Sequence, residues 1–408
     1  MPVSPQRIAA DLWVPRVAAP TVVRTTISNP RWSRHRARRL RWRMRMGSTM
    51  NVTVVGSGNG GMAVAFDFAQ HGHRVSLYSR AEHAHHNLEA VRAKGGITSQ
   101  GRLEGFAPMA YAGTDIAAAM EGAEVVFVVG PAFATEPFGR DLAPHLRTGM
   151  IVVICPGSCG GALAFKRAAG LAVHDDSIMV GETSTLPYAC RADGHGNVHV
   201  FHRFDTGLFA SAVPRSGNGK LLEILRQVYP STIEAATVFQ TSLQNGNPVI
   251  HPAVTLMNAA LLERTGGDFL FYEEGVTSAA GRLMEAVDTE RLAIATALGV
   301  TILSEPDIGV EQGYMTESNY TTGYSRAPGF RGIKAPTAID SRYLTEDVGY
   351  TLVFFTDLAR RLAVPTPTMN AIIEITSVVL ARDLRAEGAR TMSALGLDDL
   401  TAEQLLSL

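Results

Sequence analysis

The chain has 408 residues, of which 46% are hydrophobic and 18% charged, so it is long enough for two packed domains and lacks the bias of disordered or fibrous proteins. Its longest apolar runs, at residues 124–130 and 150–155, are far shorter than the roughly 20 residues of a membrane-spanning helix, so no membrane span is predicted. The three cysteines are too few and wrongly spaced for a zinc site, and their scarcity favours a reducing, cytoplasmic location.

Residues 1–49 differ from the rest of the chain in charge. They hold eleven arginines and one acid, Asp11, which leaves −11 for residues 50–408 because the whole chain carries −1. A body this acidic is a poor partner for nucleic acid, whose binding depends on Lys and Arg. The segment has no apolar periodicity, so we interpret it as an unstructured extension, with an RNA-binding arm or a transit peptide as the alternatives.

From residue 51 the chain alternates short apolar strands with helical segments. Helices are predicted at residues 60–71 and 134–146. Strands are predicted at residues 51–56, 74–79, 124–130, 150–155 and 178–181. Such alternation is typical of a parallel sheet covered by helices on both faces, to which residues 199–212 are expected to add edge strands.

Beyond residue 233 long helical patterns replace the short apolar runs. Between two of these patterns, residues 305–341 are rich in Gly, Pro, Tyr, Thr and Ser, and a structureless stretch of this length is more often a functional loop than filler. The sequence thus predicts an α/β Rossmann dinucleotide-binding domain at residues 50–232, followed by an all-helical C-terminal domain at residues 233–408. The helical patterns cover residues 253–264, 279–298, 350–362 and 369–385.

A Gly-rich turn joins the first predicted strand to the first predicted helix: Gly56-Ser57-Gly58-Asn59-Gly60-Gly61. It fits the G-x-G-x-x-G pattern, in which the first glycine makes the tight turn, the second lets the backbone approach a pyrophosphate, and the third allows close packing of helix on strand. The helix that follows offers unpaired N–H groups and a positive dipole end to phosphates. Since a strand precedes the turn and a helix follows it, we predict that these six residues bind a dinucleotide.

The end of the second predicted strand indicates which dinucleotide binds. An Asp or Glu there would accept hydrogen bonds from the ribose hydroxyl of NAD and repel a phosphate. This chain has Tyr78-Ser79-Arg80 instead. With a hydroxyl and a guanidinium and no acid, Ser79 and Arg80 favour NADP over NAD. The alternative is that Arg80 is only a solvated loop residue.

A polar stripe marks the start of the predicted helical domain. A dinucleotide domain supplies only the hydride, so a proton donor and a substrate anchor must come from elsewhere. If residues 244–258 are helical, one face of an otherwise apolar helix carries Gln244, Asn247, His251 and Asn258. Buried polar groups must find partners, so this stripe faces either an internal network or a site. Because His is the commonest general acid or base, we favour a site around His251.

A second candidate segment closes the long loop, at Ser341-Arg342-Tyr343-Leu344-Thr345-Glu346-Asp347. Arg342 is suited to clamp a substrate carboxylate, and Asp347 is suited to orient an imidazole and stabilise its charge. The alternatives are a surface arginine and an acid in the first turn of a helix, where the helix dipole favours it. Spacing alone does not decide between these interpretations.

Several motifs in the second half of the chain together resemble the octopine/opine dehydrogenase family, and the likeness runs from Met50 nearly to the C-terminus. The resemblance implies a dinucleotide domain joined to a helical domain, with the active site between them. It also implies an NAD(P)H-dependent reductive condensation of an amino acid with a 2-oxo acid such as pyruvate. The motifs occur in the family's order: Asn247-Pro248-Val249-Ile250-His251-Pro252 with Asn258, Phe271-Tyr272-Glu273-Glu274-Gly275, Asp288-Thr289-Glu290-Arg291, Arg331-Gly332-Ile333-Lys334-Ala335-Pro336 and Arg342-Tyr343-Leu344-Thr345-Glu346-Asp347.

Carried over by position, the resemblance implies that His251 is the catalytic histidine and Asp347 its partner aspartate. It makes Arg342 the arginine that binds a carboxylate. We expect Asn258 to be a further substrate-binding residue, and we expect no metal. One departure is Gly349, where many relatives have Pro, which predicts a looser start of that helix. The expected partners are an amino acid and a 2-oxo acid, with neither nucleic acid nor membrane, and a homodimer is the assembly considered.

Two other functions compete with this one. A related two-domain dehydrogenase, such as a glycerol-3-phosphate or ketopantoate reducing enzyme, relies on a catalytic lysine, and fold by itself does not fix function. A non-catalytic nucleotide sensor would use the dinucleotide site for regulation. The chain has only four lysines, of which Lys166 and Lys334 are the plausible catalytic ones, beside Lys94 and Lys220.

Overall fold

The computed structural model of this chain describes residues 49–83 and 85–408. The extension predicted at residues 1–49 therefore lies outside the described residues, except for Thr49. Within the described part, no helix is long and apolar enough to span a lipid bilayer.

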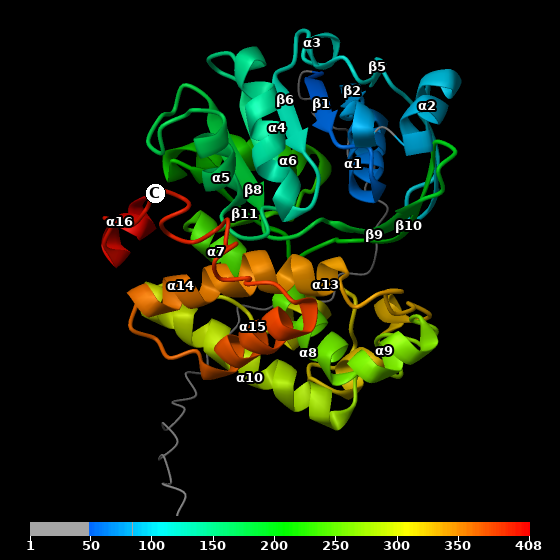
Figure 1. Ribbon diagram of the computed structural model, residues 1–408. Helices are drawn as coiled ribbons and strands as arrows, with labels where there is room; N and C mark the ends of the chain where they lie inside the picture. Colours follow the sequence, from blue (N-terminus) through cyan, green and yellow to red (C-terminus); the bar gives the residue numbers. More distant parts are fainter. Residues whose placement is uncertain (1–48, 84) are drawn as a thin grey trace, which may run out of the picture. The chain divides into compact units, whose positions relative to one another are not determined.

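Among the described residues, an eight-stranded sheet forms the centre of the first part of the chain (Figure 1). Neighbouring strands pair in parallel, except that β8 and β11 are antiparallel. The strand order is β12-β11-β8-β7-β6-β1-β2-β5, so the direction of winding reverses between β1 and β6. The strands are β1 (Asn51–Val55), β2 (Arg74–Tyr78), β5 (Tyr111–Gly113), β6 (Val125–Val128), β7 (Ile151–Ile154), β8 (Met179–Thr183), β11 (Phe209–Val213) and β12 (Ile233–Glu234).

Helices connect the parallel strands, as the alternating pattern predicted. Strands β6 and β7 are the runs VVFV and IVVI and are buried throughout, as expected of strands covered on both faces. Figure 1 shows the helices beside the sheet, and the predicted Rossmann fold is confirmed. The helices are α1 (Asn59–Gln70), α2 (His85–Lys94), α3 (Ile116–Ala119), α4 (Thr135–Leu142), α5 (Gly161–Ala168) and α6 (Asn218–Val228).

A second, four-stranded sheet was not predicted. Residues 199–212 were expected to be edge strands of the main sheet, but only β11 joins it, whereas β10 pairs with β3 and β9 in the order β4-β3-β10-β9. In β10, Val198 and Val200 are buried while His199 and Phe201 are exposed, so one face of this sheet packs inward, with α1 among its contacts. The strands are β3 (Gly96–Gly101), β4 (Gly105–Pro108), β9 (Tyr188–Ala192) and β10 (Asn197–Arg203).

From residue 238 the described chain is helical, with three differences from the sequence prediction. The helix expected at 253–264 is two helices that break at Asn258, and the loop expected at 305–341 contains the short helices α11 and α12. The helix expected at 369–385 ends at Leu380. The helices are α7 (Val238–Leu243), α8 (Asn247–Met257), α9 (Ala259–Thr265), α10 (Ser278–Leu298), α11 (Glu305–Glu311), α12 (Thr322–Ser325), α13 (Arg342–Thr345), α14 (Val353–Arg361), α15 (Pro367–Leu380) and α16 (Ala402–Ser407).

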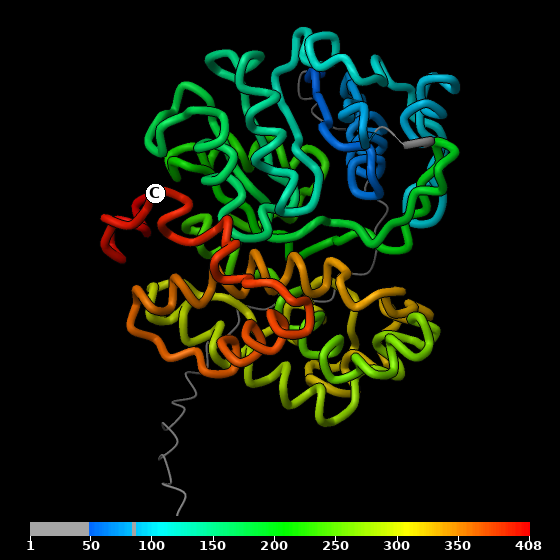
Figure 2. Tube along the Cα trace, in the orientation of Figure 1, coloured from blue at the N-terminus to red at the C-terminus, as the bar shows by residue number. Residues whose placement is uncertain are grey.

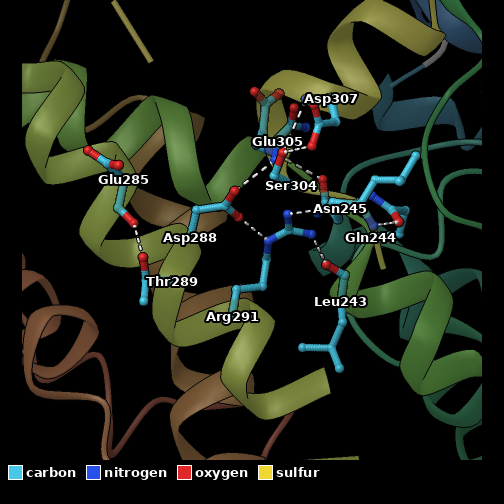
Figure 3. A network of polar contacts seen from close by, with 12 residues as sticks. Leu243, Gln244, Asn245, Glu285, Asp288, Thr289, Arg291, Ser304, Glu305 and Asp307 are labelled. Carbon is cyan, nitrogen blue, oxygen red and sulfur yellow. Dashed lines mark hydrogen bonds and ion pairs between the residues drawn. The ribbon is translucent and has the colours of Figure 1, made fainter. Parts of the chain in front are cut away.

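A buried ion pair on α10 fixes the helices around the site (Figure 3). Arg291 Nε donates to Asp288 Oδ1 over 2.6 Å, and both side chains are fully buried. Arg291 also donates to the main-chain carbonyls of Leu243 and Leu303, while Asp288 Oδ2 accepts from Glu305 N at 2.7 Å. Breaking such a pair leaves an uncompensated buried charge. These residues of the family-like motif therefore hold α7, α10 and α11 together.

Candidate active site

The Gly-rich turn has the geometry that the sequence predicted. Gly56 has φ of +114°, and a Cβ there would lie 2.1 Å from the carbonyl oxygen of Val129. A Cβ on Gly61 would lie 1.7 Å from the Gly56 carbonyl oxygen, so helix and strand approach as only glycine permits. A Cβ on Gly58 would meet nothing within 4 Å. The turn thus has an open cradle at its second glycine.

The first turn of α1 is free to bind an anion. Its N-cap, Gly58, provides no side-chain hydrogen bond, and no acid lies in the first turn. Helix N-termini of this kind attract phosphate groups through their N–H groups and dipole. Open space at Gly58 and uncapped N–H groups both fit a dinucleotide pyrophosphate.

Three other predicted residues of the turn contact the protein itself. Asn59 Oδ1 accepts from the backbone N–H of Ala192 at 2.9 Å, which ties the turn to β9. Ser57 is buried, with 4% of its surface exposed. A Cβ on Gly60 would lie 3.0 Å from the Leu186 side chain, so this glycine packs tightly against it. The roles of Ser57, Asn59 and Gly60 in binding a cofactor stay predictions.

Arg80 has two carboxylate partners that the sequence did not indicate. Its Nε and one terminal nitrogen donate to Asp141 over 2.6 and 3.0 Å, and its other terminal nitrogen contacts Glu82 at 3.2 Å. Ser79 is buried and donates to the carbonyl of His83. The guanidinium is thus oriented by acids, chiefly by Asp141 of α4.

His251 and Asp347 form a close pair in the helical part. Nδ1 of His251 lies 2.8 Å from Oδ2 of Asp347, and 9% and 6% of the two residues' surfaces are exposed. Asp347 begins a π-helical segment, residues 347–352, that leads into α14. Such segments are frequent at functional sites. This π-helix also contains Gly349, where a looser helix start was predicted.

Aromatic side chains enclose the imidazole. Tyr343 stacks on His251 with ring centroids 3.8 Å apart, and the Tyr272 hydroxyl lies 3.2 Å from Nε2. Burial raises the pKa of Tyr272 well above its usual value, so its hydroxyl stays protonated and is able to donate to Nε2. Because Asp347 accepts at Nδ1, this arrangement corresponds to a neutral imidazole with its proton on Nδ1. The sequence motifs contained both tyrosines but did not indicate these contacts.

The predicted polar stripe is wrong as a single helix face. Gln244 caps α7 and exchanges hydrogen bonds with the backbone of Leu303, because the chain turns before α8 begins at Asn247. Asn247 is exposed. Asn258 donates from Nδ2 to the carbonyls of Val254 and Gly275 at 2.8 and 2.9 Å, which secures the break between α8 and α9. Of the stripe, His251 is the residue that meets Asp347.

Two arginines lie within electrostatic reach of the residue that stacks on His251. Burial raises the pKa of Tyr343, the nearby Asp347 adds to this rise, and Arg191 and Arg342 oppose it. Arg342 is 65% exposed and donates from Nε to Glu346 over 2.6 Å. Arg191, at the end of β9, is exposed and forms no ion pair with any described carboxylate. No pattern in the sequence indicated a role for Arg191, because Tyr343 lies about 150 positions further along the chain.

Comparison with known proteins identifies the family. A model of the NAD/NADP octopine/nopaline dehydrogenase alpha-helical domain matches residues 234–380, and one of the NAD-dependent glycerol-3-phosphate dehydrogenase N-terminus matches residues 51–160. An opine dehydrogenase of Arthrobacter sp. (strain 1C) is 33% identical over 358 residues, covering 87% of this chain and 97% of the relative. The chain belongs to the opine dehydrogenase family.

Solved structures agree with this family in fold. An octopine dehydrogenase described with NADH and L-arginine superposes with a TM-score of 0.70 at 20% identity, covering 88% of this chain and 98% of that one. A yersinopine dehydrogenase described with NADP+ gives a TM-score of 0.64 at 16% identity, covering 88% and 97%. The resemblance seen in the sequence is confirmed, and so are the Rossmann and helical fold and the class of NAD(P)-dependent oxidoreductase.

The two plausible catalytic lysines of the competing dehydrogenases have other contacts in this family member. Lys166 is fully buried in α5 and donates from Nζ to the carbonyls of Asp175 and Val213. Lys334 is 67% exposed and pairs with Asp268. Neither lysine contacts the His251 and Asp347 pair. With the opine dehydrogenase relatives, these contacts disfavour the competing functions.

Proposed function

We propose that this protein joins the amino group of an amino acid to the carbonyl carbon of a 2-oxo acid and reduces the resulting imine, releasing water. The proposal rests on the His251 and Asp347 contact of 2.8 Å within a member of the opine dehydrogenase family. A bound NAD(P)H supplies the hydride. The residues of this chain bind the two substrates, orient them and move the proton.

Asp347 holds the imidazole and His251 moves the proton. With the Nδ1 proton donated to Asp347, Nε2 is the atom that exchanges a proton with the substrate nitrogen. As His251 gains that proton, the carboxylate 2.8 Å away stabilises the imidazolium charge. The Tyr272 hydroxyl occupies Nε2 in this structure, so a substrate must displace it or receive the proton through it.

Two cations near Tyr343 match the two carboxylates of the substrates. The Arg342 side chain is 65% exposed although its Nε is bound to Glu346, and Arg191 of β9 lies within electrostatic range of the same tyrosine. Arginine recognises carboxylates through paired, charge-assisted hydrogen bonds. We assign Arg342 to one substrate carboxylate and Arg191 to the other. Asn258 supports the site by fixing the end of α8.

Arg342→Met and Arg191→Met test this assignment. Each variant should raise KM for one of the two acids by about 10-fold or more, since a charge-assisted pair is lost. The KM for NADPH serves as the internal control. A rise in the KM for NADPH alone would show that the arginine binds cofactor phosphate instead and would overturn its assignment.

For the cofactor, we propose that NADP is accepted at Arg80. The end of β2 carries no acid, and Asp141 orients the guanidinium through Nε and one terminal nitrogen. The remaining terminal nitrogen contacts only the exposed Glu82, which a 2′-phosphate can replace. Gly56, Gly58 and Gly61 would hold the pyrophosphate at the N-terminus of α1.

The deciding experiment is a substrate screen with purified protein. Pyruvate and other 2-oxo acids are combined with a panel of amino acids and NADPH or NADH, and oxidation is followed at the nicotinamide absorbance band. Cofactor oxidation should require both an amine and an oxo acid and yield a secondary amine visible by mass spectrometry. His251→Ala should lower turnover by about 100-fold or more. Wild-type turnover in this variant would contradict the proposal.

Three further predictions accompany this function. The domain division proposed at residues 232 and 233 falls just before β12, the edge strand of the main sheet, and the helices begin at Val238. A reducing, cytoplasmic location suits Cys155, Cys159 and Cys190, which are free and buried. A homodimer is proposed for the assembly, and sedimentation analysis of the purified protein tests it.

A further inference from the structure

One residue next to the cofactor crevice is held through its main chain by two charged side chains from the helical part. The N–H of Ala132 donates to Glu346 Oε1 over 2.7 Å, and the carbonyl of the same residue accepts from a terminal nitrogen of Arg390 over 2.7 Å. These residues lie 214 and 258 positions from Ala132 in the chain. All three are buried, with 2%, 5% and 0% of their surfaces exposed.

Ala132 lies where a dinucleotide site meets the sheet. It follows β6, and the strand order reverses between β6 and β1. In open α/β sheets, ligands bind in the crevice at such a reversal. The same segment also touches the Gly-rich turn, because the carbonyl of Val129 sits where a Cβ of Gly56 would be, at 2.1 Å. Any shift of the Ala132 segment therefore moves one wall of the cofactor site.

Glu346 lies directly beside the proposed catalytic pair. It precedes Asp347 in the chain, and its second oxygen accepts from Arg342 Nε over 2.6 Å. Burial raises the pKa of Glu346, and the charge of Arg342 opposes that rise. One carboxylate thus connects the wall of the cofactor crevice to the segment that presents Asp347 to His251.

Arg390 holds a second loop of the sheet in the same way. Its other terminal nitrogen donates to the carbonyls of Cys159 and Gly160 at 3.2 Å, in the loop between β7 and α5. Figure 2 shows the chain after α15 returning to the region of α5. No described carboxylate forms an ion pair with Arg390. The terminal nitrogens of its guanidinium donate to main-chain carbonyls instead. A buried cation of this kind is costly, which indicates a positional role.

We propose that Glu346 and Arg390 are positioning residues that clamp the main chain of Ala132 from both sides and so set the distance between the cofactor crevice and the His251 and Asp347 pair. The inference rests on the proposed function and adds to it the means by which the two parts of the site are kept in register. Arg390 lies beyond the matched helical domain, which ends at residue 380. Reacting atoms must be held closely, since a misplacement of about 1 Å costs roughly 100-fold in rate.

The sharpest test removes the donor and leaves both charged residues in place. Ala132 is the first residue of a short helix, a position at which proline is tolerated, so Ala132→Pro deletes the N–H. Because the proline Cδ takes the place of the amide hydrogen, Glu346 Oε1 must also withdraw from residue 132. Arg390→Lys keeps a charge and a donor, and Arg390→Met removes both. Arg326→Met changes an exposed arginine and is the matched control.

Two readouts separate positioning from simple loss of folded protein. With NADPH deuterated at C4, Ala132→Pro should lower kcat by about 10-fold to 100-fold and raise the isotope effect on kcat, because the hydride step becomes slower. The KM for the amino acid should change by less than about 3-fold, since its binding groups are intact. A merely structural defect would reduce the amount of active enzyme and leave the isotope effect unchanged.

Hydrogen exchange of residues 129–135, measured without cofactor, gives a readout that needs no activity. Exchange should be faster in Arg390→Met and intermediate in Arg390→Lys, with circular dichroism showing retained helix. If Arg390→Met fails to fold, Ala132→Pro and Arg390→Lys decide. If Ala132→Pro and Arg390→Lys fold and keep the wild-type kcat, isotope effect and hydrogen exchange, the proposed clamp is overturned. Full activity of His251→Ala would instead overturn the proposed function.

Discussion

His251 Nδ1 and Asp347 Oδ2 lie 2.8 Å apart although 96 positions separate the two residues in the chain. Asp347→Asn should lower kcat by about 100-fold or more, because an amide neither fixes the Nδ1 proton nor stabilises an imidazolium. Steady-state NADPH oxidation at saturating substrates measures the effect. Asp340→Asn, at a nearby exposed carboxylate, is the control. Wild-type kcat for Asp347→Asn would remove Asp347 from the mechanism.

The Tyr272 hydroxyl, 3.2 Å from Nε2, should matter less than Asp347. Tyr272→Phe is expected to lower kcat by about 3-fold to 10-fold, the effect of losing one neutral hydrogen bond to the imidazole. Tyr314 also stacks on Phe330, as Tyr272 does, but its hydroxyl makes no hydrogen bond to any described residue, so Tyr314→Phe is the matched control. A loss as large as that of His251→Ala would mean that the proton passes through Tyr272.

Substitutions of two glycines in the cofactor turn should distinguish an effect on NADPH binding from an effect on folding stability. Gly58→Ala places its methyl group in open space, so stability should stay within about 1 kcal/mol while the Kd for NADPH rises by about 10-fold or more. Gly61→Ala places a methyl group 1.7 Å from the Gly56 carbonyl oxygen and should lower Tm as well. Fluorescence titration and thermal unfolding measure both variants. Unchanged NADPH binding in Gly58→Ala would argue against the turn as the pyrophosphate site.

Arg80 provides a test of cofactor choice. Arg80→Met should reduce kcat/KM with NADPH by about 10-fold or more and leave the value with NADH within about 3-fold, because only NADPH carries the 2′-phosphate. The two cofactors, compared in one protein preparation, control for folding. Equal losses with both cofactors would show that Arg80 serves structure through Asp141 rather than selecting the phosphate.

Glu182 predicts how stability depends on pH. This carboxyl of β8 is fully buried beside α7, and burial raises its pKa to about 7, although the hydrogen bond from Thr241 opposes the rise. The folded state then holds a proton that the unfolded state has lost above pH of about 4.5, so stability falls as pH rises from about 4.5 to 7, by about 3 kcal/mol.

Glu182→Gln, which cannot ionise, isolates this effect. Its unfolding free energy relative to wild type should be higher at pH 8 than at pH 5, as urea titration at both values would show. Glu285→Gln, on the exposed side of α10, is the control and should show no such difference. A difference of the opposite sign would mean that Glu182 is ionised in the folded protein at neutral pH.

Local patterns in the sequence determined the parts of this protein that depend on neighbouring residues. Gly56, Gly58 and Gly61 act within one turn, so the strand, turn and helix around them, and with them the class of cofactor, could be read from spacing alone. The buried β-branched runs likewise specified the parallel strands, because burial on both faces requires them. The family motifs contain both His251 and Asp347, so the resemblance predicts that these two residues are partners.

Only the tertiary structure decided which distant groups meet and how the polar residues are used. Spacing grouped Gln244 with His251, but a turn before Asn247 sent Gln244 to the backbone of Leu303. The sequence around Arg80 does not predict its partner, because Asp141 is brought against it only by packing. The clamp on Ala132 joins three positions that share no local pattern, since side-chain contacts across 200 or more positions arise from packing of whole elements. The sequence thus specified the chemical groups, and packing specified their partners.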